Sequence, residues 1–306
     1  MNLRQALTRR GHYGSLIGIF LFMLPGLFIY TFLMLYPTIQ SFVFSVIDWK
    51  GVLPTWKFIG FRYYIQMVQD PIFLSVILNN LRAWVFNAIF MLPLALVLAY
   101  TLHRHVRWVS VFRTIYYIPT ITAAVMLAFL WRFIFIKAFP PVLTFLHMTS
   151  IPFLSKDGIV QWTVNFPASW AGVGFWMVIF LAGMANISQE LIEAAQLDGA
   201  GETQILRYII LPGIWGLFIT ANVAVVASSL GAFIYQQLMP VSPGGPSDRS
   251  HTLISYTLQL LWGNQNSQLQ FWGKGSAFAV FQFTLSAVIT FVMLRYSRKS
   301  RQETGG

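Results

Sequence analysis

Few residues in this 306-residue chain could perform chemistry, and their spacing builds no catalytic site. The chain has no cysteine, which excludes disulfides, thiolate zinc sites and iron–sulfur clusters. His103 and His105 lie two residues apart, but no nearby acid completes a metal coordination shell. The run Trp272–Ser276 resembles a phosphate-binding loop, yet Gln268 stands where that loop requires its first glycine. We therefore expect no metal, no cofactor and no ATP site in this chain.

A second group of polar residues lies inside long apolar stretches, where lipid would penalise it. These side chains must face other helices or an aqueous pathway, and hydrogen bonds between helices are the common outcome for serine. The amides of Asn222 and Gln282 both donate and accept hydrogen bonds, which matches the hydroxyl groups of a sugar. The candidate residues of a solute pathway are Asn222, Ser228, Ser229, Gln282 and Ser286.

The third candidate is the polar stretch 186–208, which we call the acidic segment and which lies between two apolar runs. Asn186 with Gln189 three residues later makes a capping box that predicts a helix start. Gly199 predicts the end of this helix in a left-handed conformation, and Gly201 permits another bend before a second short helix. The sequence therefore predicts a bent helix pair.

Charge distinguishes the acidic segment from an ordinary connector at a membrane surface. Such connectors are typically rich in lysine and arginine, which suit anionic lipid. Here a single base, Arg207, stands against the four acids Glu190, Glu193, Asp198 and Glu202. This balance favours docking to another protein, with an amphipathic surface connector as the alternative.

The composition indicates that these residues belong to a membrane protein. Only 9% of the residues are charged and 57% are hydrophobic, against about 25% and 45–50% in soluble domains. The net charge of +11 would also suit a nucleic-acid binder, but the bases form short clusters between apolar runs. We expect an all-α membrane protein whose six transmembrane helices lie at about 15–35, 82–102, 115–136, 167–185, 209–233 and 275–294.

The basic clusters predict the orientation. The tail 1–14, the stretch 103–113 and the tail 296–306 are short and basic, as cytoplasmic segments are. Both termini and the acidic segment are therefore expected on the cytoplasmic side. The first apolar run is longer than the core of a cleavable signal peptide, so we expect it to remain as the first helix of a membrane domain over 15–295.

The acidic segment also resembles a known family. Glu193-Ala194-Ala195, Gly199 and the run Ile209-x-Leu211-Pro212 are similar to the signature of binding-protein-dependent ABC importer permeases. This resemblance implies the type I importer fold, with the acidic segment as a coupling helix in a cleft of a separate ATPase. It implies an ATPase contact for Glu193 and a sharp bend at Gly199. The extended coupling motif comprises Glu193, Ala194, Ala195, Asp198, Gly199, Ala200 and Gly201.

Other stretches resemble the carbohydrate branch of that family, to which the maltose-transporter permeases belong. They are Phe58–Phe61 with Tyr64, Asp70-Pro71-x-Phe73, and Gly244-Gly245-Pro246 with Thr252-Leu253. The resemblance implies a multi-pass protein of a bacterial-type inner membrane that imports a sugar or oligosaccharide, with glycerol phosphate or another polyol derivative as the alternative. The implied partners are a second, homologous permease chain, an extracytoplasmic solute-binding protein and an ATPase dimer, which binds ATP and Mg.

Two classes of protein outside this family are alternatives. A transporter driven by an ion gradient would be expected to bury Asp, Glu or His in a span, and no predicted span contains Asp or Glu. A membrane-embedded transferase would need a carboxylate or metal cluster near the interface. The acids of this chain are in the acidic segment or scattered, which disfavours both classes.

Overall fold

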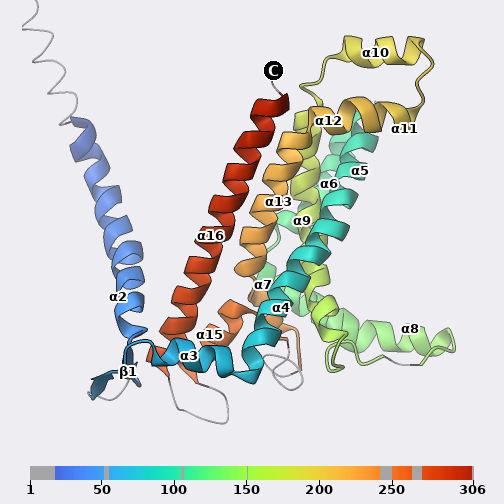
Figure 1. Cartoon of the computed structure of the whole chain (residues 1–306). Helices are drawn as coiled ribbons and strands as arrows, with labels where there is room; N and C mark the ends of the chain where they lie inside the picture. Colours follow the sequence, from blue (N-terminus) through green and yellow to red (C-terminus); the bar gives the residue numbers. More distant parts are fainter. Residues whose placement is uncertain are drawn as a thin grey trace, which may run out of the picture.

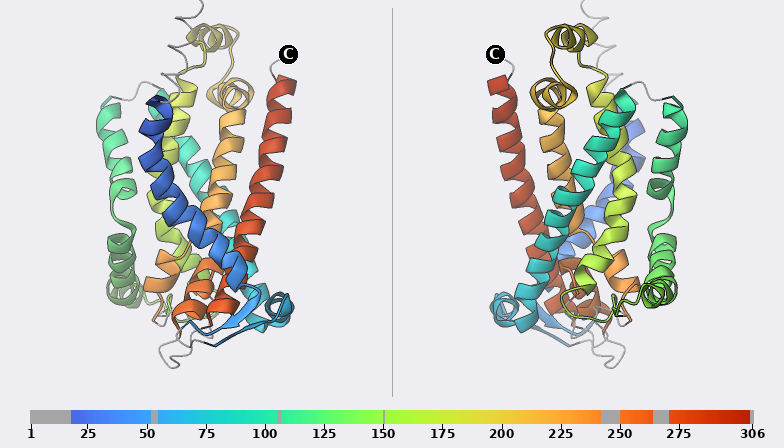
Figure 2. Two further views of the ribbon diagram at one scale, coloured as in Figure 1. Left: turned by 90° about the vertical axis from the view of Figure 1, so that its left-hand side faces the viewer. Right: turned by 90° about the vertical axis from the view of Figure 1, so that its right-hand side faces the viewer.

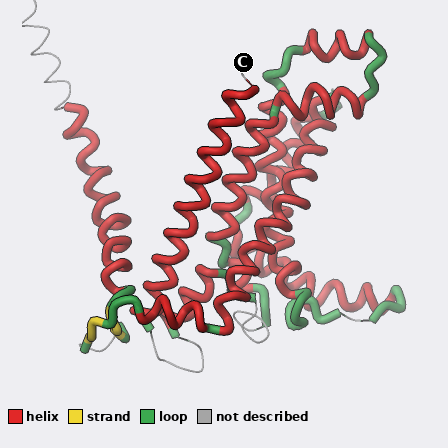
Figure 3. The backbone as a smooth tube through the Cα atoms, viewed as in Figure 1, coloured by secondary structure: helices red, strands yellow, loops and turns green. Residues whose placement is uncertain are grey.

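The computed structural model describes residues 18–51, 55–104, 107–149, 151–241, 250–263 and 271–304, and in these ranges it is almost entirely helical (Figures 1 and 3). The predicted tail 1–14, His105 and the Gly244-Gly245-Pro246 turn lie outside these ranges. Among the described residues, six helices are long and apolar enough to cross a membrane: Gly18–Phe44, Pro71–His103, Ala124–Phe145, Val160–Met184, Trp215–Leu238 and Trp272–Met293. The all-α prediction with six spans is confirmed.

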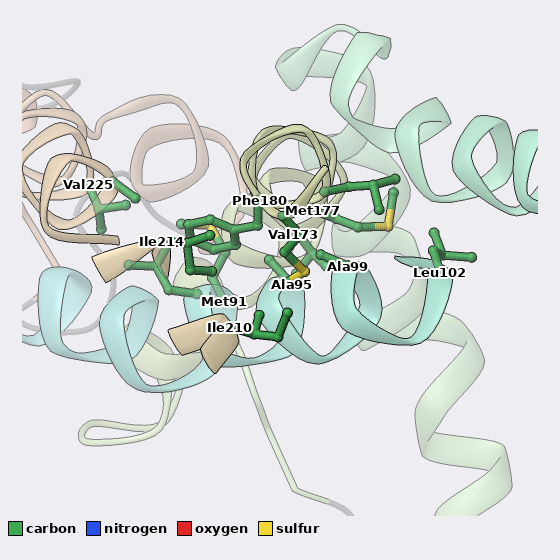
Figure 4. Packing of buried hydrophobic residues seen from close by; sticks show 14 of the residues in the cluster. Met91, Ala95, Ala99, Leu102, Val173, Met177, Phe180, Ile210, Ile214 and Val225 are labelled. Atoms are coloured by element: carbon green, nitrogen blue, oxygen red, sulfur yellow. The ribbon is translucent and has the colours of Figure 1, made fainter. Parts of the chain in front are cut away.

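The largest buried cluster lies between α5 (Leu92–His103) and the second half of α9 (Val160–Met184), from Val173 onward. Ala95 and Ala99 are fully buried, and small side chains at this spacing let the two helix backbones approach closely. Met177 and Phe180 of α9 fill the space beside them (Figure 4). The helix α13 (Trp215–Leu230) extends this core with Ala221 and Val225.

The first long helix has a different environment. It ends in the π-helical turn η1 (Thr31–Leu35) and α2 (Tyr36–Phe44), and it stands apart from the other helices along most of its length (Figures 1 and 2). Its Phe42 ring meets Phe283 of α16 (Trp272–Thr304) edge to face at 6.0 Å. Nearly all of its other apolar side chains are exposed. A helix that is apolar all round is stable only in lipid or against another apolar surface.

The predicted third span, 115–136, is divided in the structure. The helix α6 (Val109–Ile121) ends at Ile121, and α7 (Ala124–Phe133) begins after two extended residues, Thr122 and Ala123. Pro119 lies within the last turn of α6, where it lacks the N–H that would bond to the preceding turn. The break follows from this proline, and the Thr120 hydroxyl donates to the Ala171 carbonyl of α9 at 2.6 Å.

Two spans begin earlier than the hydropathy predicts. The second starts at Pro71 with α4 (Pro71–Phe86) and continues through the π-helical turn η2 (Asn87–Met91) into α5. The fourth starts at Val160 rather than near 167. Both added stretches contain polar side chains that lower the mean hydropathy, and four of these, Asn79, Asn80, Gln161 and Asn165, are buried and bond to other elements. Asn80 donates to the Ser229 carbonyl at 2.8 Å and accepts from the Leu253 N–H at 2.9 Å.

The end of the molecule opposite to α10 (Gln189–Leu197) carries the short elements (Figure 1). They include an antiparallel hairpin of β1 and β2, while the short helix α8 lies across the direction of the long helices (Figure 2). These elements are β1 (Ile47–Trp49), β2 (Trp56–Phe58), α3 (Arg62–Gln69), α8 (Phe139–Phe145), α14 (Ile234–Leu238) and α15 (Leu253–Trp262).

The run that resembles a phosphate-binding loop has a packing role. A Cβ atom on Gly273 would lie 2.1 Å from the Ile47 carbonyl oxygen of β1, and one on Gly275 would lie 2.7 Å from the Leu261 side chain of α15. Lys274 pairs with Asp70 at 2.9 Å. The two glycines let the start of α16 approach its neighbours, and the lysine joins it to α4.

Asp70 is the centre of a joint between α4, α15 and α16 at the end of the molecule opposite to α10, which we call the outer joint. Its carboxylate accepts from the Ile72 N–H at 3.0 Å, the Tyr256 hydroxyl at 3.1 Å and Lys274 Nζ at 2.9 Å. Burial alone would raise the pKa of Asp70. The hydrogen bonds from Lys274 and the Ile72 N–H, the charge of Lys274 and the Tyr256 hydroxyl together hold that pKa below its ordinary value.

The crossing of α6 and α9 gives a first prediction. A Cβ atom on Gly174 would lie 2.1 Å from the Tyr116 carbonyl oxygen, which is backbone and has little room to shift. We expect Gly174→Leu to destabilise the protein by about 1–3 kcal/mol, seen as a lower Tm in detergent. Gly26→Leu is the matched control, because a Cβ there meets nothing within 4 Å. Equal Tm values for the two variants would contradict the close crossing.

The outer joint gives a second prediction. Because the folded-state pKa of Asp70 is lowered, its stabilisation is complete above its usual pKa of 3.8 and is lost as the pH falls through the folded-state pKa. Asp70→Asn should therefore lower the Tm at pH 7, and the difference from the parent protein should shrink below about pH 4. Asp157→Asn, which changes an exposed acid, is the control. A difference in Tm that stays constant with pH would exclude the carboxylate as its source.

Candidate functional site

The acidic segment projects beyond the ends of the long helices as a pair of short helices (Figures 1 and 2). The first is α10, and the second is α11 (Glu202–Ile205), which continues through the π-helical turn η4 (Leu206–Ile210) and α12 (Leu211–Gly213) into α13. The predicted bent helix pair is thus confirmed, with both helices on the side where α16 ends.

The predicted capping box at the start of the acidic segment is wrong. The residue before α10 is Ser188, and Asn186 lies beyond the end of α9, where its Nδ2 donates to the Ala182 carbonyl at 2.9 Å. The reason is that α9 reaches Met184, so Asn186 bonds to the free carbonyls of a helix that ends rather than to the N–H groups of one that starts.

The predicted bend at Gly199 is present. Its φ is +83°, and the following Ala200 N–H donates to the Ala195 carbonyl at 2.9 Å, which closes the end of α10. An added Cβ on Gly199 would meet nothing within 4 Å, so the backbone conformation is what requires glycine there. Gly201 has an ordinary negative φ, and its N–H donates to Gln204 Oε1 at 2.7 Å, which begins α11.

The acidic segment has a buried face and an exposed face. Ile192 and Ile205 are buried in the cluster that contains the core of α5 and α9. Leu197, at the tip of α10, is 90% exposed, and Tyr208 is 68% exposed. A hollow of about 330 Å³ lies at the bend, lined by Ala195, Asp198, Gly199, Ala200, Gln204 and Tyr208, among others.

The exposed face is suited to bind a protein. Glu190, Glu193 and Asp198 are all exposed on it, next to the apolar side chain of Leu197. Exposed apolar side chains rimmed by charge are typical of protein interaction sites. The fourth acid, Glu202, is different, because Arg104 and Tyr100 of the second span contact its carboxylate.

The five candidate pathway residues lie on two helices, α13 and α16. Three of them donate a hydrogen bond to a backbone carbonyl. Asn222 Nδ2 donates to Phe218 of its own helix at 3.3 Å. Gln282 Nε2 of α16 donates to the Leu230 carbonyl at 3.0 Å, which is one of the free carbonyls at the end of α13. Ser229 is buried and accepts from Asn87 Nδ2 at 3.3 Å, while Ser228 donates to Val225 at 3.0 Å. Ser286 is partly buried on α16.

A set of buried and partly buried polar side chains lies between α4, η2, α9, α13 and α14, and of this set the sequence predicted a role only for Ser229. In it, Gln236 Nε2 donates to Asn165 Oδ1 at 3.0 Å, and Ser169 Oγ donates to Asn87 Oδ1 at 2.6 Å. Gln161, Asn165 and Ser169 recur every four residues, which places them on one face of a helix and was the available signal. We call this set the polar seam: Asn79, Asn80, Asn87, Gln161, Asn165, Ser169, Ser229 and Gln236.

Comparisons with known proteins place the chain among transport proteins. Residues 91–302 match the family model described as binding-protein-dependent transport system inner membrane component. A relative from Pyrococcus horikoshii, named "Probable ABC transporter permease protein PH1215", is 28% identical over 93% of this chain and 97% of its own length. The diacetylchitobiose uptake system permease protein NgcF of Streptomyces coelicolor is 30% identical over 78% of this chain and 71% of its own length.

Among solved structures, the chain is similar to one chain of a bacterial alginate ABC transporter crystallised in complex with an alginate pentasaccharide-bound periplasmic protein. The TM-score is 0.78 over 98% of both chains, at 20% sequence identity. At this identity the likeness concerns the fold, and it includes nearly all of the chain.

Proposed function

Because this chain belongs to the family of binding-protein-dependent transport system inner membrane components, we propose that it forms half of the translocation pathway of an ATP-driven importer for sugars or oligosaccharides. It is an ABC importer permease of the type I fold, a transport subunit rather than an enzyme, and ATP is hydrolysed by a separate chain. The observation that carries the proposal is the exposed acidic helix pair, whose residues fit the coupling signature of this family.

The proposed ATPase contact is the exposed face of α10 and the bend that follows it. Glu193 supplies a carboxylate, Leu197 an apolar contact and Gly199 the turn that presents both. When two ATPase subunits, which bind ATP and Mg, draw together, the acidic segment moves with them. Since η4 and α12 continue from this segment into α13, that movement reaches a helix of the pathway.

The proposed orientation places the acidic segment and both termini in the cytoplasm and the β1 and β2 hairpin outside, in an inner membrane. The positions of charged residues support it. Arg104 at the end of α5 and the basic tail at the end of α16 lie at the same end of the molecule as α10 (Figure 1). A solute-binding protein would then dock on the outer elements.

Two further features support the proposed assembly and cargo. The exposed apolar surface of the first long helix needs lipid or the second permease chain to cover it. The relative NgcF is named for diacetylchitobiose uptake, and the structural neighbour is an alginate transporter, so both handle saccharides. The proposed pathway residues are Asn222, Ser228, Ser229, Gln282 and Ser286, with polar atoms that suit hydroxyl groups.

The docking proposal predicts that two substitutions in the acidic segment uncouple the importer. Glu193→Lys places a base where the partner is expected to meet an acid, a change that commonly costs several kcal/mol at an interface. Gly199→Val puts a β-branched residue at a φ of +83°, at a cost of about 1–3 kcal/mol. In both variants, ATPase subunits should co-purify poorly or hydrolyse ATP without substrate uptake.

The controls separate docking from folding and from orientation. Gly60→Val imposes a similar strain, with φ of +58°, in the loop after β2, and should leave ATPase co-purification unchanged. In this cysteine-free chain, Leu197→Cys should react with a membrane-impermeant thiol reagent only after the membrane is broken. Labelling in intact cells would show that the acidic segment lies outside and that the proposed orientation is wrong. If both coupling variants retain the ATPase, hydrolyse ATP in response to substrate and take up substrate normally, the docking proposal is wrong. The acidic segment would then be a surface connector.

The cargo proposal predicts a different defect for amide substitutions in α13 and α16. Asn222→Leu and Gln282→Leu should lower the rate of sugar uptake or change substrate preference, while the complex still assembles, since each amide supplies about 0.5–1.5 kcal/mol of hydrogen bonding. Thr284→Val is the control on α16, because that hydroxyl bonds only to the Val280 carbonyl of its own helix at 2.8 Å. Unchanged uptake kinetics in both Leu variants would assign these amides to helix packing.

A further inference from the structure

Besides the packing of Ile192 and Ile205 into the core, the acidic segment is attached to the membrane helices at three places. Two are covalent, because the chain enters from α9 and leaves through η4 into α13. The third is the contact between Glu202 and the end of α5, about one hundred residues away in sequence. Apolar packing is non-directional, whereas hydrogen bonds and an ion pair join particular atoms. The third attachment therefore adds a directional constraint on the orientation of the helix pair.

The third attachment consists of polar contacts from two successive turns of α5. The Tyr100 hydroxyl lies 3.1 Å from Glu202 Oε2 and 3.2 Å from the Glu202 carbonyl oxygen, so it can donate to either. Arg104, the C-cap residue of α5, forms an ion pair with the same carboxylate. Since Glu202 is the first residue of α11, these contacts hold the start of the second short helix.

Packing around this contact is incomplete. A cavity of about 110 Å³ lies between α5 and the acidic segment, lined by Tyr100, His103, Arg104, Gln189, Ile192 and Gln196, with Ile205 and Ile210 below them. Close-packed interfaces resist movement, whereas a hollow with room for several water molecules lets the acidic segment shift against α5. Glu202 and Arg104 are also about half exposed, so their ion pair is weak enough to break and re-form.

We propose that Tyr100 and Arg104 are positioning residues that hold α11 through Glu202 and so transmit movement of the acidic segment to the second span as well as to α13. This inference rests on the proposed docking of the ATPase to α10. Glu202 therefore works inside the chain, while Glu193 and Asp198 face the partner. Because α5 packs against α9, movement of the contact between Glu202 and α5 is transmitted to the core of the permease.

The test measures substrate uptake per ATP hydrolysed in the assembled importer with its ATPase and solute-binding protein. Arg104→Gln and Glu202→Gln should each lower this ratio by about twofold to fivefold, the range in which an ion pair of this exposure shifts an equilibrium. The exchange of both residues, Arg104→Glu with Glu202→Arg, should restore most of the ratio. Arg113→Gln, an exposed base of the same basic stretch, is the matched control and should leave the ratio unchanged.

A second measurement separates this inference from the proposed function. A photo-crosslinker on Leu197→Cys should reach the ATPase in the parent protein and equally in the Arg104 and Glu202 variants. Absence of the crosslink in the parent would overturn the proposed docking and this inference with it. An intact crosslink with an unchanged uptake ratio in both single variants, or no restoration in the exchanged pair, would overturn the positioning role alone.

Discussion

Polar groups that lie between the spans of this protein must find partners within the protein, because lipid offers none. Most of the fold can be understood from that constraint. Asn80 bonds the end of α13 and the start of α15 to α4, and Gln282 bonds a free carbonyl at the end of the same helix α13. Thr120 bridges α6 to α9 near the break in the third span. Polar side chains are thus concentrated where helices end or break, which is where backbone groups lack helical partners.

The same constraint explains how much of the structure the sequence predicts. Long apolar runs require helices in lipid, so the number of spans and the helical class follow from composition alone. The starts of α4 and α9 cannot be predicted in this way. Four polar residues near these starts are typical of loops until their partners on other elements are known: Asn79, Asn80, Gln161 and Asn165. The break after Ile121 depends on Pro119, and a hydropathy scale does not show that a proline interrupts a helix.

In the candidate site, features that depend on neighbouring residues were predicted correctly, and features that depend on distant residues were not. Local chemistry predicts the bend at Gly199, since a positive φ is a property of one residue and its neighbours. The predicted capping box at Asn186 was wrong because Asn186 bonds to a carbonyl at the end of α9. That bond depends on where α9 ends, which the residues around Asn186 do not reveal. The role of Glu202 required a residue one hundred positions away, and no spacing rule along the chain would join Arg104 to it.

The two ends of the molecule carry joints of different strength, and the difference agrees with a permease that is driven from one side. At the outer joint Asp70 accepts three hydrogen bonds, and its side chain is only 10% exposed, so breaking the joint would leave a buried charge without its partner. At the contact of Glu202 with Tyr100 and Arg104, which we call the inner joint, the Glu202 side chain is 48% exposed and both of its partners line a cavity, so water can replace either partner at little cost. The inner joint can therefore shift together with the acidic segment, while the outer joint keeps α4, α15 and α16 together. In the proposed orientation, movement would then begin at the ends of α5 and α13 that lie next to the acidic segment and would reach the opposite end through whole helices.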